Sequence, residues 1–143
     1  MKKINGGTAF LIGSFVVSLG LAAFFANRMF PIIGAEQPFV VTYAKALNQK
    51  APLKVDAQTR LIQVNAYGPN IVQYIYKLDQ IQGYKLNVDS LQQVMTPRLT
   101  NAIADLPEYP EFVKNQVQLE YVYKDRAEVK VLSIVIKPTD YTK

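Results

Sequence analysis

The stretch VQLEYVYKDRAEVKVLSIVI, residues 117–136, carries the strongest fold signal in this chain of 143 residues. Apolar side chains alternate with polar or less buried positions on both sides of Asp125-Arg126-Ala127: first Val117, Leu119, Tyr121 and Tyr123, then Val129, Val131, Ser133 and Val135. Alternation with a period of two is typical of β-strands, because successive side chains of a strand point to opposite faces. The stretch therefore predicts a β-hairpin.

The loop length sets the expected register of this hairpin. A two-residue loop would place tyrosines opposite charged residues, so we expect a three-residue loop. The resulting pairs are Tyr123 with Val129, Tyr121 with Val131 and Val117 with Val135. The apolar residues Leu132, Ile134 and Ile136 then lie on the opposite face, so we expect this last strand to be covered on both sides and central in the sheet.

A second hairpin is expected earlier in the chain. Residues 61–66 (LIQVNA) alternate, residues 67–70 (YGPN) are turn formers, and residues 72–76 (VQYIY) form the returning strand. The register that places one apolar set on one face pairs Ala66 with Val72, Val64 with Tyr74 and Ile62 with Tyr76.

Helices are expected before and after this hairpin. Pro38 suits the first turn of a helix that ends at Ala51-Pro52 and has the apolar face Phe39, Val40, Tyr43, Ala46 and Leu47. Asn87 or Asp89 can cap a later helical region that is bent or restarted at Thr96-Pro97, and residues 110–113 form one more short turn. The expected fold class is α+β: a small four-stranded, mostly antiparallel sheet of two hairpins, with helices packed on one face.

The apolar run AFLIGSFVVSLGLAAFFA, residues 9–26, predicts a transmembrane helix. Eighteen uncharged residues give about 27 Å of helix, close to the roughly 30 Å hydrocarbon core of a bilayer. Lys2, Lys3 and the amino terminus outnumber Arg28, which favours a cytoplasmic N-terminus. We expect a cytoplasmic stub (1–8), a signal-anchor helix (9–26), a linker (27–35) and a periplasmic α+β domain (36–143).

A cleaved signal peptide is the alternative interpretation of the same run. The best small-x-small cleavage site is Gly20-Leu21-Ala22, but the apolar residues continue beyond it to Ala26, where a signal peptide would turn polar. We therefore expect the segment to stay on the protein as an anchor.

Small residues recur every four positions along the predicted anchor, at Ser14, Ser18, Ala22 and Ala26. Such a stripe lets the backbone of another membrane helix approach closely, so these four residues are candidates for helix docking. Small residues are also common in exported apolar segments, which is the alternative explanation.

The net charge of +5 does not predict nucleic-acid binding. Three of the 16 basic residues, Lys2, Lys3 and Arg28, flank the predicted anchor. The remaining 13 are nearly balanced by 11 acidic residues. No basic cluster is visible along the remaining sequence, whereas contacts to a phosphate backbone need several converging lysines or arginines.

The chain contains no histidine and no cysteine. Catalytic systems that pair histidine with serine or cysteine are therefore excluded, as are the usual zinc ligand sets, disulfides and lipid attachment through cysteine. Asp105, Glu108 and Glu111 form the densest acidic group, but they lack the pattern of a calcium loop and suit the end of one helix and the start of the next. We expect no catalytic residue, no metal site and no cofactor.

Tyrosine is the one enriched chemical type, with the motifs YIY at 74–76 and YVY at 121–123. Strand periodicity puts Tyr74 and Tyr76 on one face, and Tyr121 and Tyr123 on one face. These four residues form a candidate aromatic binding face for a glycan or a peptide. The alternative is that they are core residues beneath the helices, since tyrosine also suits half-buried strands.

The order of these elements resembles that of small exported bacterial α+β proteins. The resemblance rests on Ala51-Pro52-Leu53, the strand hairpin, residues 96–103 (TPRLTNAI) and residues 117–123 (VQLEYVY). The nearest characterised group is the pilotins of type II secretion, which are periplasm-facing assembly factors. Pilotins typically carry a lipid-attachment cysteine and often a disulfide, and this chain has neither.

The expected function is a single-pass, membrane-anchored, non-enzymatic accessory or binding subunit of a bacterial envelope complex in the inner membrane. Its expected partner is another membrane protein, contacted through the anchor helix and the periplasmic domain. The alternatives are a cleaved soluble periplasmic or secreted ligand-binding protein, an enzyme that uses carboxylates or tyrosines alone, and a phage- or plasmid-type envelope factor.

Overall fold

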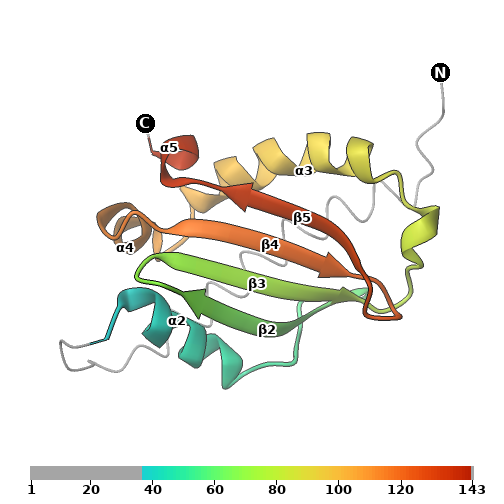
Figure 1. The fold of residues 1–143 in the computed structure, drawn as a ribbon, viewed down its shortest axis with the longest axis horizontal. Coiled ribbons are helices and arrows are strands. Elements are labelled where there is room, and N and C mark those ends of the chain that lie inside the picture. The colour runs from blue at the N-terminus through green and yellow to red at the C-terminus, as the bar shows by residue number, and fades with distance from the viewer. Residues whose placement is uncertain (1–36, 143) are drawn as a thin grey trace.

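One five-stranded sheet, in the order β1-β2-β3-β4-β5, organises the computed structural model, which describes residues 37–142 (Figure 1). The strands are β1 (Leu53–Lys54), β2 (Thr59–Tyr67), β3 (Ile71–Leu78), β4 (Gln118–Lys124) and β5 (Lys130–Ile136). The helices are α2 (Phe39–Asn48), α3 (Val88–Ile103), α4 (Tyr109–Lys114) and α5 (Pro138–Tyr141), with a 3₁₀ turn at Gly83–Lys85. The predicted α+β class is confirmed, with a sheet of five strands rather than four.

The hairpin β2–β3 has the expected register over most of its length. Ala66 lies opposite Val72 and Val64 lies opposite Tyr74. The register then shifts between Leu61 and Gln63, so that Leu61 rather than Ile62 lies opposite Tyr76. One extra residue in a strand is a β-bulge, which the alternation pattern alone does not reveal.

The two hairpins join through a parallel pair. Tyr74 lies opposite Tyr121 and Tyr76 opposite Tyr123 along β3 and β4, which run in the same direction. A parallel connection needs a long crossover, and residues 79–117, which include α3, supply it. The sheet is therefore mixed.

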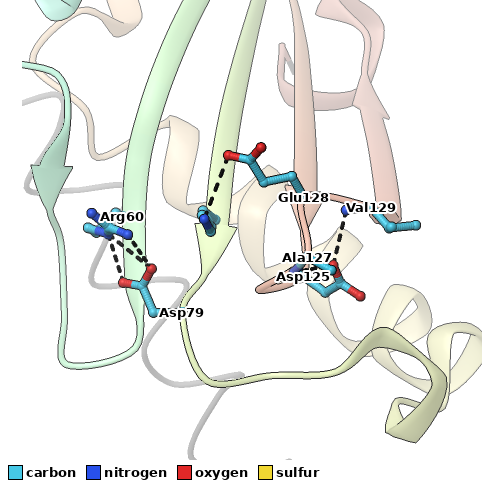
Figure 2. Close-up of polar contacts among 7 residues, drawn as sticks. Arg60, Asp79, Asp125, Ala127, Glu128 and Val129 are labelled. Carbon is cyan, nitrogen blue, oxygen red and sulfur yellow. Dashed lines mark hydrogen bonds and ion pairs between the residues drawn. The ribbon is translucent and has the colours of Figure 1, made fainter.

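The predicted register of β4 and β5 is wrong. Tyr121 lies opposite Ile134 and Tyr123 opposite Leu132, not opposite Val131 and Val129. The connecting loop spans 125–129, because the Asp125 carboxylate accepts hydrogen bonds from the N–H groups of Ala127 and Val129 at 2.9 and 3.0 Å (Figure 2). These bonds lower the pKa of Asp125, that from Val129 most.

The change of register exchanges the two faces of β5. Leu132, Ile134 and Ile136 are buried, whereas Val135 is 45% exposed. β5 is an edge strand, so the expectation of a central strand covered on both sides is also wrong. The physical reason is that both alternating sets of this strand are apolar, and burial of the bulkier set removes more surface from water.

The helices and one face of the sheet enclose a single core. Figure 1 shows α2 alongside β2 and α3 alongside β5, in agreement with the contacts between these elements. The core includes Tyr43 and Leu47 of α2 with Leu91, Met95 and Leu99 of α3. The opposite face of the sheet, called the outer face below, carries the alternate strand residues.

Helix α3 begins as expected and is a single continuous helix. The Asn87 side chain caps it by accepting a hydrogen bond from the Ser90 N–H at 3.1 Å. The helix runs without interruption through Pro97, so of the two expected outcomes, a bend or a restart, the restart is wrong. Pro97 is exposed, so its ring lies against solvent and not against the core.

The predicted anchor at 9–26, with the docking candidates Ser14, Ser18, Ala22 and Ala26, lies outside the described residues. Among residues 37–142, no helix combines the length and apolarity needed to cross a membrane.

Candidate binding face

The four tyrosines of the predicted aromatic face lie in the core. Tyr74, Tyr76, Tyr121 and Tyr123 are each 2% exposed or less. The parallel register stacks them in two pairs, with ring centroids 5.2 Å apart for Tyr74–Tyr121 and 5.1 Å apart for Tyr76–Tyr123. The helices cover these rings, so they are structural core and not an exposed platform.

The hydroxyl groups of this cluster are also buried. Those of Tyr43 and Tyr74 share a hydrogen bond of 2.8 Å, and those of Tyr76 and Tyr121 have no hydrogen-bond partner among the described residues. Burial raises the pKa of Tyr43, Tyr74 and Tyr121 well above the ordinary value for tyrosine. These groups therefore stay protonated at neutral pH.

Of the three predicted neighbouring acidic residues, only Glu108 is buried. Both of its carboxylate oxygens lack a hydrogen-bond partner among the described residues, and desolvation raises its pKa to about 7. Asp105 and Glu111 are exposed. Across residues 37–142 no three such side chains come together to hold a metal ion.

A small pocket of about 190 Å³ lies between α3, α4 and α5. The residues that line it are Thr100, Asn101, Ala104, Tyr109, Asp140 and Tyr141. Asp140 is engaged by the Lys137 N–H at 2.8 Å, and the Tyr109 hydroxyl donates to the Tyr141 carbonyl at 3.3 Å. The first of these bonds caps α5, and the second joins α4 to α5.

Amide side chains form a connected network on the outer face. Asn65 donates to Gln73 at 3.1 Å, Gln73 donates to Glu120 at 3.2 Å, and Gln118 donates to Glu120 at 3.0 Å. Gln63 adds a bond of 2.7 Å to Asn65. This amide network crosses β2, β3 and β4 and offers donors and acceptors that match a polypeptide backbone.

An apolar pair lies beside the amide network. Ile75 and Val122 are neighbours in the β3–β4 register and are each 8% exposed, yet they lie outside the core cluster. The edge strand β5 continues this face with Ser133 opposite Val122 and with the exposed Val135 opposite Glu120.

Every strand contributes a basic residue to one line across the sheet, called the basic row below. Register partners connect its members in turn: Lys54, Arg60, Lys77, Lys124 and Lys130. Figure 2 shows Arg60 facing Asp79, whose carboxylate accepts two hydrogen bonds from Nε at 2.8 and 3.0 Å. Lys77 Nζ lies 3.6 Å from Glu128.

Sequence reasoning missed this row. Neighbouring members of the row are up to 47 residues apart along the chain, from Lys77 to Lys124, and only strand pairing brings them together. The count of 13 basic against 11 acidic residues beyond Arg28 says nothing about their arrangement in space.

No family model matches the chain, and no curated protein sequence matches it. Several solved structures do match its fold. A candidate secreted protein from Pseudomonas aeruginosa is similar with a TM-score of 0.61 at 11% identity, covering 85% of this chain and 97% of that one. The pilotin EpsS of the Vibrio vulnificus type 2 secretion system has a TM-score of 0.53 at 10% identity, covering 92% of this chain and 98% of that one. At these identities the likeness shows the fold, so the distant resemblance to pilotins is confirmed at that level.

Proposed function

We propose that this protein is a non-enzymatic accessory subunit of a bacterial envelope complex. The observation that carries the proposal is its fold, which is shared with a pilotin of a secretion system and with a candidate secreted protein. The absence of histidine and cysteine from the sequence agrees with a binding role rather than a catalytic one.

The proposed subunit is tethered to the inner membrane by residues 9–26, with the domain in the periplasm. The length of this apolar run and its flanking lysines support the tether. Ser14, Ser18, Ala22 and Ala26 are the proposed contact with a partner helix in the membrane.

The outer face is the proposed contact surface of the domain. It combines the amide network with exposed side chains of the edge strand β5, around the largely buried Ile75–Val122 pair. Polar groups around an apolar centre are typical of non-obligate protein interfaces.

A second candidate is a cleaved protein that acts in soluble form. The similarity to a candidate secreted protein favours it, because the structural match covers 97% of that protein's chain.

The test is gentle detergent extraction of the tagged full-length chain, followed by mass spectrometry of the intact protein and of whatever co-purifies. We expect an intact N-terminus and a membrane protein in stoichiometric amount. A truncated, solitary, water-soluble protein would contradict the tether and favour the second candidate.

A matched pair of variants tests the contact within the membrane. Ser18→Leu with Ala22→Leu fills the small-residue stripe and should abolish co-purification. Val16→Leu with Val17→Leu adds bulk to the opposite side of the same helix and should leave co-purification unchanged. Equal effects of the two pairs would contradict docking through the stripe.

A further inference from the structure

The basic row concentrates charge that the fold does not neutralise. Like charges directly opposite each other on neighbouring strands destabilise a sheet, and four successive register pairs here are basic on both sides. Asp79 and Glu128 approach Arg60 and Lys77. An excess of three positive charges is left over.

Three members of the row have no ion-pair partner among the described residues. Lys54 and Lys130 are exposed and Lys124 is half-buried, and the two ion pairs found in residues 37–142 involve Arg60 and Lys77. Solvent and counterions balance these three lysines in the described part of the chain, so they are available to carboxylates of another molecule.

We propose that the outer face binds an acidic segment of a partner polypeptide, with carboxylates on the basic row and backbone on the amide network. This proposal rests on the proposed function, since it names the kind of partner that the accessory subunit would bind. With strands about 4.8 Å apart, the row spans roughly 19 Å. An extended segment places alternate side chains about 6.7 Å apart, so two or three carboxylates can reach the row together.

The surroundings of the row favour a polypeptide over an anionic lipid surface. Asp79 and Glu128 lie within the row and would repel a uniformly negative membrane. The amide network beside the row offers hydrogen bonds that suit peptide groups. A protein segment can place its charges between the two carboxylates, whereas a lipid surface cannot.

The test measures binding of fluorescent octaglutamate to the full-length chain in an uncharged detergent, with octaglutamine as the uncharged probe. The variant Lys124→Gln with Lys130→Gln removes two members of the row. The control Lys50→Gln with Lys114→Gln removes the same charge from exposed positions on other parts of the surface. Lys54→Gln is an additional single change on β1.

We expect octaglutamate affinity to fall about fivefold to tenfold in the double row variant and by less than about twofold in the control. Lys54→Gln should weaken binding by about twofold. Melting temperatures should not fall, because each change relieves repulsion between like charges. Octaglutamine should not bind.

Equal loss in the row variant and the control would overturn the proposal, since binding would then follow net charge alone. Row-dependent binding of the soluble lipid dihexanoylphosphatidylglycerol, without binding of octaglutamate, would overturn it in favour of a lipid headgroup.

The same row variant separates this proposal from the proposed function. A partner that co-purifies equally with the wild-type chain and with the row variant would leave the accessory role intact and overturn the acidic segment. Row-dependent binding of octaglutamate by a chain that co-purifies with nothing would support the basic row and contradict the accessory role.

Discussion

The hydroxyl groups of Tyr43 on α2 and Tyr74 on β3 share a hydrogen bond of 2.8 Å inside the core. This bond joins α2 to the centre of the sheet. The two rings meet edge to face, with centroids 6.3 Å apart and planes at 90°. The helix is therefore held against the sheet by a polar contact as well as by apolar packing.

Loss of either hydroxyl should destabilise the fold. Tyr43→Phe and Tyr74→Phe should each lower the free energy of unfolding by about 1–2 kcal/mol, because the remaining buried hydroxyl loses this partner. The double variant should cost less than the sum of the two single changes. Urea unfolding measures these differences, and Tyr67→Phe on the exposed surface is the control. Strict additivity would contradict a coupled pair.

Glu108 should make stability depend on pH. Its pKa is raised from an ordinary value of 4.5 to about 7, so the folded state holds a proton that the unfolded state releases between these values. The free energy of unfolding should therefore fall as pH rises from about 4.5 to about 7. Glu108→Gln cannot ionise, so its free energy of unfolding should not fall in this way. The variant should be more stable than wild type by up to about 3 kcal/mol at pH 8.

Thermal unfolding of wild type and of Glu108→Gln across pH 4 to 8 measures this effect. Glu111→Gln, at an exposed position of α4, should keep the wild-type profile. Parallel profiles for wild type and Glu108→Gln would show that the carboxyl is not desolvated.

Gly83 should tolerate no side chain. A Cβ at this position would lie 2.2 Å from Cγ1 of Val131, so the Val131 side chain, β5 or the 3₁₀ turn would have to move. Gly83→Ala should lower the free energy of unfolding by about 1–3 kcal/mol. Adding Val131→Ala removes the clashing atom and should restore part of the loss. If Val131→Ala lowers the free energy of unfolding as much in the Gly83→Ala variant as it does in the wild-type chain, the predicted clash is wrong.

Asn48 should be needed at the end of α2. Its amide group donates to the Val64 carbonyl at 2.6 Å and accepts from the Val64 N–H at 2.8 Å, next to the bulge in β2. Asn48→Ala loses both bonds and should cost about 1–2 kcal/mol. Asn48→Asp keeps the acceptor but turns an oxygen toward the carbonyl, so it should be no better than alanine. Urea unfolding compares both with Gln49→Ala, an exposed neighbour.

The two halves of the sheet differ in how well the sequence predicted their register. In β2 and β3 the alternation and the turn residues 67–70 agree, and Ala66 pairs with Val72 as expected. In β5 both alternating sets are apolar, so periodicity does not choose between Val131 and Leu132 as the core position. The side chain of Asp125, which binds two N–H groups of its own loop, fixes a longer connection than hydrophobic pattern alone suggests.

For the candidate sites, too, the sequence predicted part of the arrangement and the tertiary structure decided the rest. The pattern of tyrosines predicted which rings share a face, but both a core and an exposed platform fit that pattern. Burial beneath α2 and α3 decides for the core, since the parallel pairing of β3 with β4 stacks Tyr74 on Tyr121 under the helices.

Local sequence was sufficient for most element types, for most of the first hairpin and for a helix start at Asn87 or Asp89, because each of these depends on residues close together in the chain. The parallel pairing of β3 with β4, the face that β5 buries and the basic row arose only when the crossover from 79 to 117 brought distant strands together. Hydrophobic pattern specifies which residues avoid water, whereas the choice of neighbours depends on packing of the whole sheet against its helices. That choice set Lys77 beside Lys124 and so placed charges from all five strands in one line.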